Sequence, residues 1–352
     1  MSTQIYVALC IVCSAAAITV NAQEIFRADD HAPVGVMADH YHEAGEVMFS
    51  YRFMSMSMKG NQDGRNELSP DQIATTVPNR FFGMPGQPPT LRIVPTDMTM
   101  DMHMLGVMFA PSDRITLMTM LNYIEKEMRH LTYQGGMGTT VRGGFTTKSS
   151  GIGDTSVAAL IRLRETNTGR LHLTAGLSMP TGDIDQTATI LAPTGMTPTM
   201  RMPYPMQLGS GTYDLIGGLT YSRFFDRSSW GAQWRSTIRM NDKDEGYALG
   251  DEHRLTSWYS GLLSSQFSWS ARVEYLERGN ISGIDGMIMG PVQTADPARQ
   301  GATRLDLALG INFATESGHR VALEYVIPAA QDLVGPQLKT DAQLILGYQH
   351  TF

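Results

Sequence analysis

Methionine and histidine are the residues of this sequence whose types and spacing could do chemistry. The chain of 352 residues contains 24 Met, and in the stretches 47–58 and 99–110 many of them alternate with other residues. Thioether sulfur and imidazole nitrogen are ligands of soft ions such as Cu(I). One hypothesis is therefore a soft-metal path in which these methionines act with histidines that precede them. Its candidate ligands are Met54, Met56, Met58, Met100, Met102, Met104, His40 and His42.

A second interpretation of the same methionines involves no metal. The Met side chain is flexible and apolar, so it fills irregular spaces and contacts apolar solutes well. His40 and His42 share one face only if the chain is extended, which leaves them an incomplete site. The second interpretation is favoured, so we expect no resident cofactor and keep Cu(I) binding as the alternative.

Nucleic-acid binding and catalysis find little support in the sequence. The net charge is −7 and no basic run offsets it, so the electrostatic footprint of a nucleic-acid binder is missing. Ser and His residues such as Ser150 and His130 occur, but no nucleophile elbow marks a catalytic pair. We therefore expect neither a nucleic-acid partner nor enzymatic activity.

The beginning of the chain is typical of a secretory signal peptide. The apolar run 5–20, which holds Cys10 and Cys13, is followed by the small-residue site Val20-Asn21-Ala22. An anchor helix is the alternative, but the run is shorter than the ~20 residues that a membrane-spanning helix needs. We predict a signal peptide over 1–22, a periplasmic or lumenal segment over 23–45 and a transmembrane barrel over 46–352.

The elements that would position the methionines are about twelve short stretches of alternating character, each close to the 9–11 residues of a transmembrane β-strand. In 305–313, for example, Leu307 and Leu309 alternate with Asp306 and Ala308. Such alternation fits lipid on one face and water on the other, although the strands of a soluble sandwich alternate too. The predicted strands are 47–58, 99–110, 115–124, 156–164, 171–179, 213–224, 230–240, 254–263, 267–276, 305–313, 320–327 and 342–352.

The lengths of the connections separate a barrel from a sandwich, because short and long connections alternate along the chain. Outer-membrane barrels join tight periplasmic turns to long extracellular loops. We therefore predict an all-β antiparallel up-and-down barrel in the outer membrane of a Gram-negative bacterium, with both termini in the periplasm. The short connections are 111–113, 165–169, 226–229, 264–266 and 315–318, and the long ones are 59–98, 126–155, 180–212, 241–253, 278–303 and 328–341.

The last predicted strand ends on the aromatic residue Phe352 and keeps Leu344, Leu346 and Tyr348 on one face. This pattern resembles the carboxyl-terminal signal by which bacterial barrels are recognised for assembly into the outer membrane. The expected partners are therefore the barrel-assembly machinery, outer-membrane lipids and a small-molecule solute.

Two further motifs carry a family resemblance. Gly151-Ile152-Gly153-Asp154 precedes one predicted strand, and Pro180-Thr181-Gly182-Asp183 follows the next. They resemble the outer-membrane barrel family often labelled as transporters or as meta-pathway phenol-degradation (MetA-like) proteins, in which such motifs bracket a strand hairpin. The resemblance covers most of the mature chain and implies a channel for small, often apolar compounds.

Alternation also assigns side chains to the lumen. Arg52 is costly against lipid, so the even positions of 47–58 should point inward, as should the even positions of 99–110 and 115–124. Three neighbouring strands would then line one lumen wall with thioethers. Besides the metal candidates, the predicted lumen-lining residues are Met48, Arg52, Met108, Met118, Met120, Asn122, Asp306, Asn312, Arg320 and Glu324.

The resulting functional prediction is a passive channel or uptake protein for a small solute of apolar or aromatic character. A barrel of about twelve strands leaves a narrow path between side chains, which residues 23–45 either leave open or plug. One alternative is a Met-rich barrel that binds or passes a soft metal such as Cu(I). The other is a structural or surface-interaction barrel without transport.

Overall fold

A computed structural model describes residues 27–240 and 246–352, so the predicted signal peptide and its two cysteines lie outside the described residues. The described chain is almost entirely β-structure. Within it, one antiparallel sheet of 13 strands dominates, and no helix is long and apolar enough to cross a membrane. The short helix α1 (Pro70–Thr76) begins at Ser69, where Ser69 and Gln72 form a capping box.

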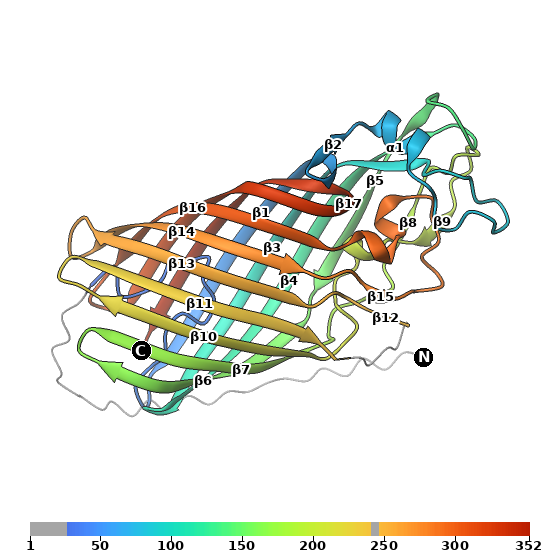
Figure 1. The fold of residues 1–352 in the computed structure, drawn as a ribbon. Helices are drawn as coiled ribbons and strands as arrows, with labels where there is room; N and C mark the ends of the chain where they lie inside the picture. Colours follow the sequence, from blue (N-terminus) through green and yellow to red (C-terminus); the bar gives the residue numbers. More distant parts are fainter. Residues whose placement is uncertain (1–26, 241–245) are drawn as a thin grey trace, which may run out of the picture.

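The sheet closes on itself because its last strand pairs with its first (Figure 1). Each remaining strand of the ring pairs with the strands next to it in order, which is the up-and-down arrangement that the sequence predicted. The all-β antiparallel barrel is thus confirmed. The ring strands are β1 (Val47–Gly64), β3 (Ile93–Ser112), β4 (Ile115–Tyr133), β6 (Thr155–Thr166), β7 (Gly169–Met179), β10 (Asp214–Phe224), β11 (Ser228–Arg239), β13 (Glu252–Leu262), β14 (Phe267–Arg278), β16 (Ala302–Ala314) and β17 (His319–Thr351).

The remaining short elements lie at the ends of the ring strands or in the loops. β2 (Asn66–Leu68) pairs with the last part of β1. β5 (Val141–Ile152) pairs with the second half of β4, and β6 pairs with its first half. The loops hold the paired strands β8 (Thr187–Thr189) and β9 (Thr199–Arg201), the paired strands β12 (Tyr247–Ala248) and β15 (Ser282–Gly283), and the 3₁₀ turns η1 (Tyr204–Met206), η2 (Gln293–Ala295) and η3 (Pro297–Arg299).

β17 supplies two of the predicted strands. Its first part pairs with β16 up to Leu333, and its second part pairs with β1 from Leu333 to Thr351. The Gln331 side chain bonds to the backbone of Thr340, as expected for a hairpin. Ten ring strands of the described chain cross the barrel once and β17 crosses it twice, which gives the predicted number of about twelve.

Three predicted loops are shorter in the structure than the sequence indicated: 59–98, 126–155 and 328–341. β1, β3, β4 and β17 continue into these ranges, and β5 lies wholly within one of them. We call the zone in which the outward side chains are apolar the apolar belt. Beyond it, the outward positions carry charged residues such as Glu125 and Arg129, while Met128 and His130 still point inward. The strands continue because backbone pairing does not require lipid on the outer face.

The two ends of the barrel differ. Brief turns join β3 to β4, β6 to β7, β10 to β11, β13 to β14 and β16 to β17, at the end where the chain terminates (Figure 1). There Phe352 and Val47 exchange backbone hydrogen bonds of 2.9 and 3.3 Å. The long connections gather at the other end. We call these the short-turn end and the long-loop end.

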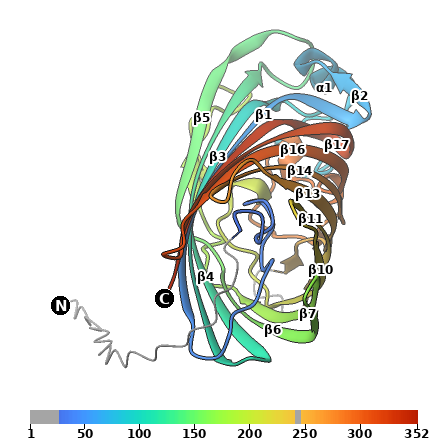
Figure 2. The same ribbon diagram turned by 90° about the vertical axis from the view of Figure 1, so that its left-hand side faces the viewer.

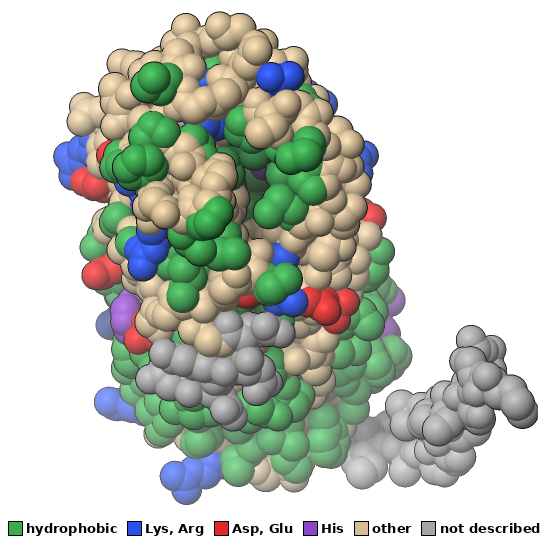
Figure 3. Space-filling model, turned by 90° about the vertical axis from the view of Figure 1, so that its right-hand side faces the viewer, with side chains coloured by type: hydrophobic (Ala, Val, Ile, Leu, Met, Phe, Trp, Pro, Cys, Tyr) green, Lys and Arg blue, Asp and Glu red, His purple; other side chains and the backbone are tan. Residues whose placement is uncertain are grey.

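The barrel has an apolar outside and a polar inside. On β16, Leu309 and Ile311 are 69% and 56% exposed, while Asp306 and Asn312 are 2% exposed. Seen from the long-loop end, hydrophobic side chains cover much of the outer wall, and polar groups and backbone dominate the rim (Figure 3). This inversion suits a wall that faces lipid and encloses water.

Candidate functional site: the lumen

Methionines form a ladder on one wall of the lumen. β1, β3 and β4 pair in register, so cross-strand neighbours share the inward face. From the short-turn end upward, the rows of inward residues on these three strands are Met48–Met108–Met118, Ser50–Gly106–Met120, Arg52–Met104–Asn122, Met54–Met102–Ile124, Met56–Met100–Lys126 and Met58–Met98–Met128.

The ladder borders a cavity of about 420 Å³ in the middle of the lumen. Met54, Met102, Met104 and Met120 line it, together with Arg52 and Asn122 of the same wall. A smaller cavity of about 30 Å³ lies toward the short-turn end. Its lining includes Met48, Met104, Met108, Met118 and Met120 together with His40.

The remaining metal candidates do not converge on one point. Met58 packs with Met98, Met128, Met202 and Met206 near the long-loop end, and the Met56 sulfur lies 4.0 Å from the Thr340 hydroxyl. Met100 is half-buried one row below Met58. His42 hydrogen-bonds Glu46 outside both cavities. The structure therefore spreads the six predicted thioether ligands along the wall, and of these six only Met104 shares a cavity with His40.

The opposite wall carries charged side chains that the sequence analysis did not single out. Arg254 bridges Glu252 and Glu274 at 2.8 and 2.5 Å, and Arg272 bridges Glu274 at 2.9 Å and also contacts Glu324. Arg239 pairs with Asp214. The sequence held a signal for these charged residues, because Arg272 and Glu274 alternate with the apolar residues Val273 and Tyr275.

Among the described residues, two arginines of the large cavity have no acidic partner. Within residues 27–240 and 246–352, Arg235 makes no hydrogen bond or ion pair, and the Arg52 guanidinium contacts only the Met37 sulfur. They project from opposite walls, since Arg52 is on β1 and Arg235 on β11, and both line the cavity. The cavity thus presents cationic groups that a solute could neutralise.

The predicted lumen residues of β16 and β17 are each less than 5% exposed. Asp306 accepts from Arg304 at 3.0 Å, and Asn312 accepts from Arg320 at 2.7 Å. Glu324 accepts from Arg272 at 3.0 Å. These side chains therefore form a polar network with their neighbours rather than an open wall.

The described part of the N-terminal segment lies inside the lumen near the short-turn end (Figure 2). Its backbone carbonyls accept hydrogen bonds from the wall: Met37 from Gln233 at 2.8 Å and Ala38 from His172 at 2.9 Å. Val36 packs with Ala32 and Trp258. Residues 27–46 therefore fill much of the lumen at this end.

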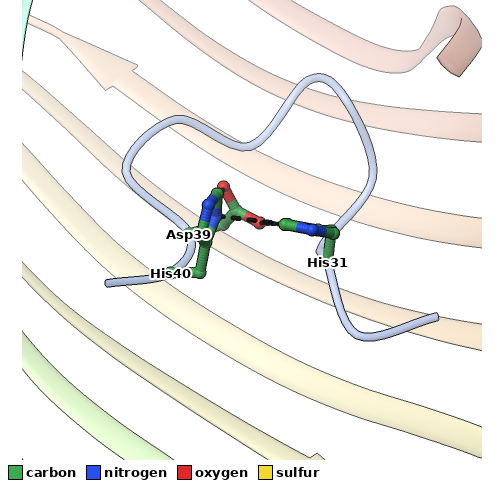
Figure 4. Close-up of side chains that lie close together, drawn as sticks. All are labelled: His31, Asp39 and His40. Carbon is green, nitrogen blue, oxygen red and sulfur yellow. Dashed lines mark hydrogen bonds and ion pairs between the residues drawn. The ribbon is translucent and has the colours of Figure 1, made fainter. Parts of the chain in front are cut away.

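Three side chains of this segment meet closely (Figure 4). The His31 and His40 Nδ1 atoms are 3.3 Å apart, and an Asp39 oxygen lies 2.9 Å from His40 Nδ1. The other Asp39 oxygen accepts from the Ala32 backbone N–H at 2.9 Å. The His42 ring lies 4.9 Å from the His40 ring.

Burial and charge set the protonation of this cluster. Burial, reinforced by His40 and Arg320, holds the pKa of His31 well below its ordinary value. Burial also lowers the pKa of His42, against the hydrogen bond to Glu46. Burial works to raise the pKa of Asp39, but the neighbouring histidines and Arg320 hold it well below its usual range. His31 and His42 are thus neutral imidazoles at neutral pH and Asp39 is a carboxylate.

The two glycine-rich motifs meet at the top of the β6–β7 hairpin. Asp154 accepts from the backbone N–H groups of Gly182 at 3.1 Å and Ser210 at 2.8 Å. Thr181 donates to the Gly153 carbonyl at 2.9 Å. A Cβ on Gly182 would lie 2.7 Å from the Gly209 backbone, so only glycine permits this approach. The motifs thus anchor the loop between β7 and β10 to the barrel wall.

That loop folds into the mouth of the barrel. Met202 and Met206 are at most 1% exposed and pack against Met98 and Met128 of the ladder. The Lys126 ammonium donates to the Pro205 carbonyl at 2.9 Å. The loop therefore narrows the lumen at the long-loop end, as the N-terminal segment does at the other.

Comparisons with known proteins identify the fold. No protein-family model matches the chain, and no curated protein matches it in sequence. Its structure resembles an outer membrane channel from Pseudomonas putida F1 with a TM-score of 0.58 and 12% identity, over 90% of this chain and 98% of that one. This is an outer-membrane barrel fold, consistent with the predicted transporter resemblance at that level.

Two other similar structures are more distant. The TodX monoaromatic hydrocarbon channel deltaS2 mutant matches with a TM-score of 0.46 and 9% identity, over 88% of this chain and 91% of that chain. A FadL homologue from Pseudomonas aeruginosa matches with a TM-score of 0.40 and 10% identity, over 88% and 90%.

Proposed function

We propose that this protein is an outer-membrane channel for a small solute with an apolar or aromatic body and an acidic group. The observation that carries the proposal is the cavity of about 420 Å³, which has thioethers and Arg52 on one wall and four further guanidinium groups on the other. Its volume lies within the range of small-molecule sites, roughly 300–1,000 Å³.

Each wall suits one part of such a solute. Thioethers adapt to irregular apolar surfaces, so the ladder can contact rings or chains of different shape. The cavity lining has five Arg and four acidic residues, which leaves one positive charge in excess. Arg52 and Arg235 are the cations without an acidic partner among the described residues, and a guanidinium binds a carboxylate through paired N–H donors.

A flux experiment tests this function. The purified mature protein is reconstituted into liposomes, and uptake of benzoate is compared with uptake of benzylamine. Benzoate should enter faster, and Arg235→Gln should slow its entry. Arg65→Gln is the matched control, because Arg65 pairs with Asp332 on the exposed outside. Flux no greater than in protein-free liposomes would refute a channel for such solutes, and equal flux of both ions would refute the anion preference.

The proposal includes an orientation. The short-turn end and both termini face the periplasm, lipids surround the apolar belt, and the strand that ends at Phe352 engages the barrel-assembly machinery. Support comes from that strand, whose outward residues Leu344, Leu346 and Tyr348 are 40–43% exposed.

Single cysteines test the orientation, since the mature chain has none after removal of the signal peptide. In intact cells an impermeant maleimide should label Met137→Cys, at an 80% exposed position of the long-loop end. It should not label Ser317→Cys in the β16–β17 turn until the outer membrane is opened. The reverse pattern would overturn the orientation.

Passage or binding of a soft metal such as Cu(I) remains the second candidate function. The ladder favours it, because inward thioethers occur in every row of β1, β3 and β4. No catalytic role is proposed, and the P. putida protein that shares the fold is a channel.

A further inference from the structure

We propose that His31, Asp39 and His40 form a binding site for a divalent transition ion of the Zn²⁺ type, which clips the N-terminal segment into a closed loop inside the lumen. This site is distinct from a thioether path for Cu(I), because its ligands are two imidazoles and a carboxylate. It does not depend on the channel function.

The geometry fits such an ion. One ligand atom from each residue lies within 4.8 Å of the others (Figure 4). The two Nδ1 atoms are 3.3 Å apart, Asp39 Oδ1 lies 2.9 Å from His40 Nδ1, and the other oxygen, Oδ2, lies 3.9 Å from His31 Nδ1. In a tetrahedral zinc site with bonds of about 2.0–2.1 Å, ligand atoms lie about 3.3 Å apart. Small side-chain adjustments would therefore bring all three atoms into bonding positions.

The ligand chemistry selects the class of ion. Two imidazoles and one carboxylate suit Zn²⁺ and its neighbours, whereas Ca²⁺ and Mg²⁺ require mostly oxygen ligands and Cu(I) prefers thioethers. The Asp39 oxygen that does not face His40 is fixed by the Ala32 N–H, which orients the carboxylate. The side chains of Asp39 and His40 are 6% and 9% exposed.

A fourth nitrogen lies beside the cluster. Within the described chain, His42 is 5% exposed and its Nε2 atom has no hydrogen-bond partner, as is also true of His40 Nε2. Because the His42 ring is 4.9 Å from the His40 ring, it can complete or flank the site. Buried polar atoms without partners are unusual, and a bound ion explains why imidazoles gather here.

The ion would stabilise the docked segment. His31 and Asp39 stand at the two ends of a stretch that the wall holds through Arg320 to Ala32 and Gln233 to Met37. An ion that binds only when these ends meet favours the folded loop by mass action. Arg320 also brings a positive charge close to the cluster, so we expect weaker affinity than in all-cysteine structural zinc sites.

The test titrates ZnCl₂ into the metal-free mature protein in detergent, in competition with a chromophoric chelator. We expect one ion per chain, and His31→Ala and His40→Ala should each weaken binding by about tenfold or more. His103→Ala is the matched control, because His103 bonds Tyr51 and lies among aromatic residues of the outer face. Circular dichroism checks that each variant keeps its β-structure.

A second measurement addresses the clip. Zn²⁺ should slow amide hydrogen exchange in residues 30–41 of the wild type and leave His31→Ala unchanged. Absence of saturable binding, or equal binding by wild type, His31→Ala and His40→Ala, would overturn the site. Binding without slower exchange would overturn the clip. Neither readout involves solute flux, so failure here is distinguishable from failure of the channel proposal.

Discussion

The carboxylate of Asp154 accepts a hydrogen bond from the backbone N–H of Ser210 at 2.8 Å, and this bond ties the loop between β7 and β10 to the barrel wall. Asp154 stands where β5 gives way to β6, and Ser210 lies shortly before β10. The same carboxylate accepts from Gly182 at the start of the loop. One side chain thus fixes both ends of the segment that fills the mouth.

Replacement of Asp154 should release this loop. Hydrogen bonds to a charged group contribute about 1.5–3 kcal/mol each, and Asp154→Ala removes two of them. We expect faster amide exchange in residues 182–210 and a higher single-channel conductance, with the barrel retained. Asp183→Ala is the control, since its carboxylate makes one exposed bond to Gln186. Identical exchange in the two variants would show that Asp154 does not anchor the loop.

The barrel was predictable because lipid imposes a simple rule on the sequence. Outward residues such as Leu307 and Leu309 must be apolar wherever the wall meets hydrocarbon, and the alternation is therefore visible without a structure. Beyond the apolar belt the outward residues need not be apolar, which is why the continuation of β4 past Ile124 was missed. Inward positions were assignable for the same reason, from Met54 on β1 to Glu324 on β17.

The contacts inside the lumen could not be predicted in the same way. Arg272 meets Glu324 only because β16 lies between β14 and β17 in a particular register. Alternation within a strand carries no information on that register. The N-terminal segment has no alternation, and its docking depends on backbone carbonyls such as that of Met37, which any sequence would offer.

The Arg272 network should contribute strongly to stability. Arg272 is 6% exposed and contacts Glu274 and Glu324, so Arg272→Leu leaves buried carboxylates without this cation. Loss of one partner of a buried pair costs about 3–5 kcal/mol. Denaturant unfolding followed by Trp fluorescence measures the difference.

The control for that experiment is Arg65→Leu. Arg65 and Asp332 are 80% and 50% exposed, and such surface pairs contribute at most about 1 kcal/mol. A loss in Arg272→Leu no larger than in Arg65→Leu would mean that lumen water solvates the carboxylates as well as Arg272 does.

Leucine replacements separate the two interpretations of the Met ladder. Leu matches Met in size and apolar character but lacks the sulfur, so an apolar path should survive the change. We expect solute flux within about twofold of wild type, a tolerance drawn from the small cost of such swaps. Loss of Cu(I) or Ag(I) binding with flux intact would instead establish a metal function. The variant combines Met54→Leu, Met56→Leu, Met100→Leu and Met102→Leu, and titration of the refolded barrel gives the metal readout.

The docking of the N-terminal segment can be probed from the barrel wall at Gly347. A Cβ built on Gly347 of β17 would collide with the Val34 side chain, which packs beside Ala308 and Ile345. In Gly347→Val the overpacking costs about 1–3 kcal/mol, and the segment should yield before the hydrogen-bonded wall does. We expect amide exchange of residues 32–38 to rise by about one to two orders of magnitude, and conductance to increase because the lumen widens. Gly217→Val is the matched control, because no atom lies within 4 Å of a Cβ at Gly217 on β10. If the Gly347 variant kept slow exchange while its unfolding midpoint fell, the wall rather than the segment would be absorbing the strain, and the lumenal segment would be a fixed part of the barrel.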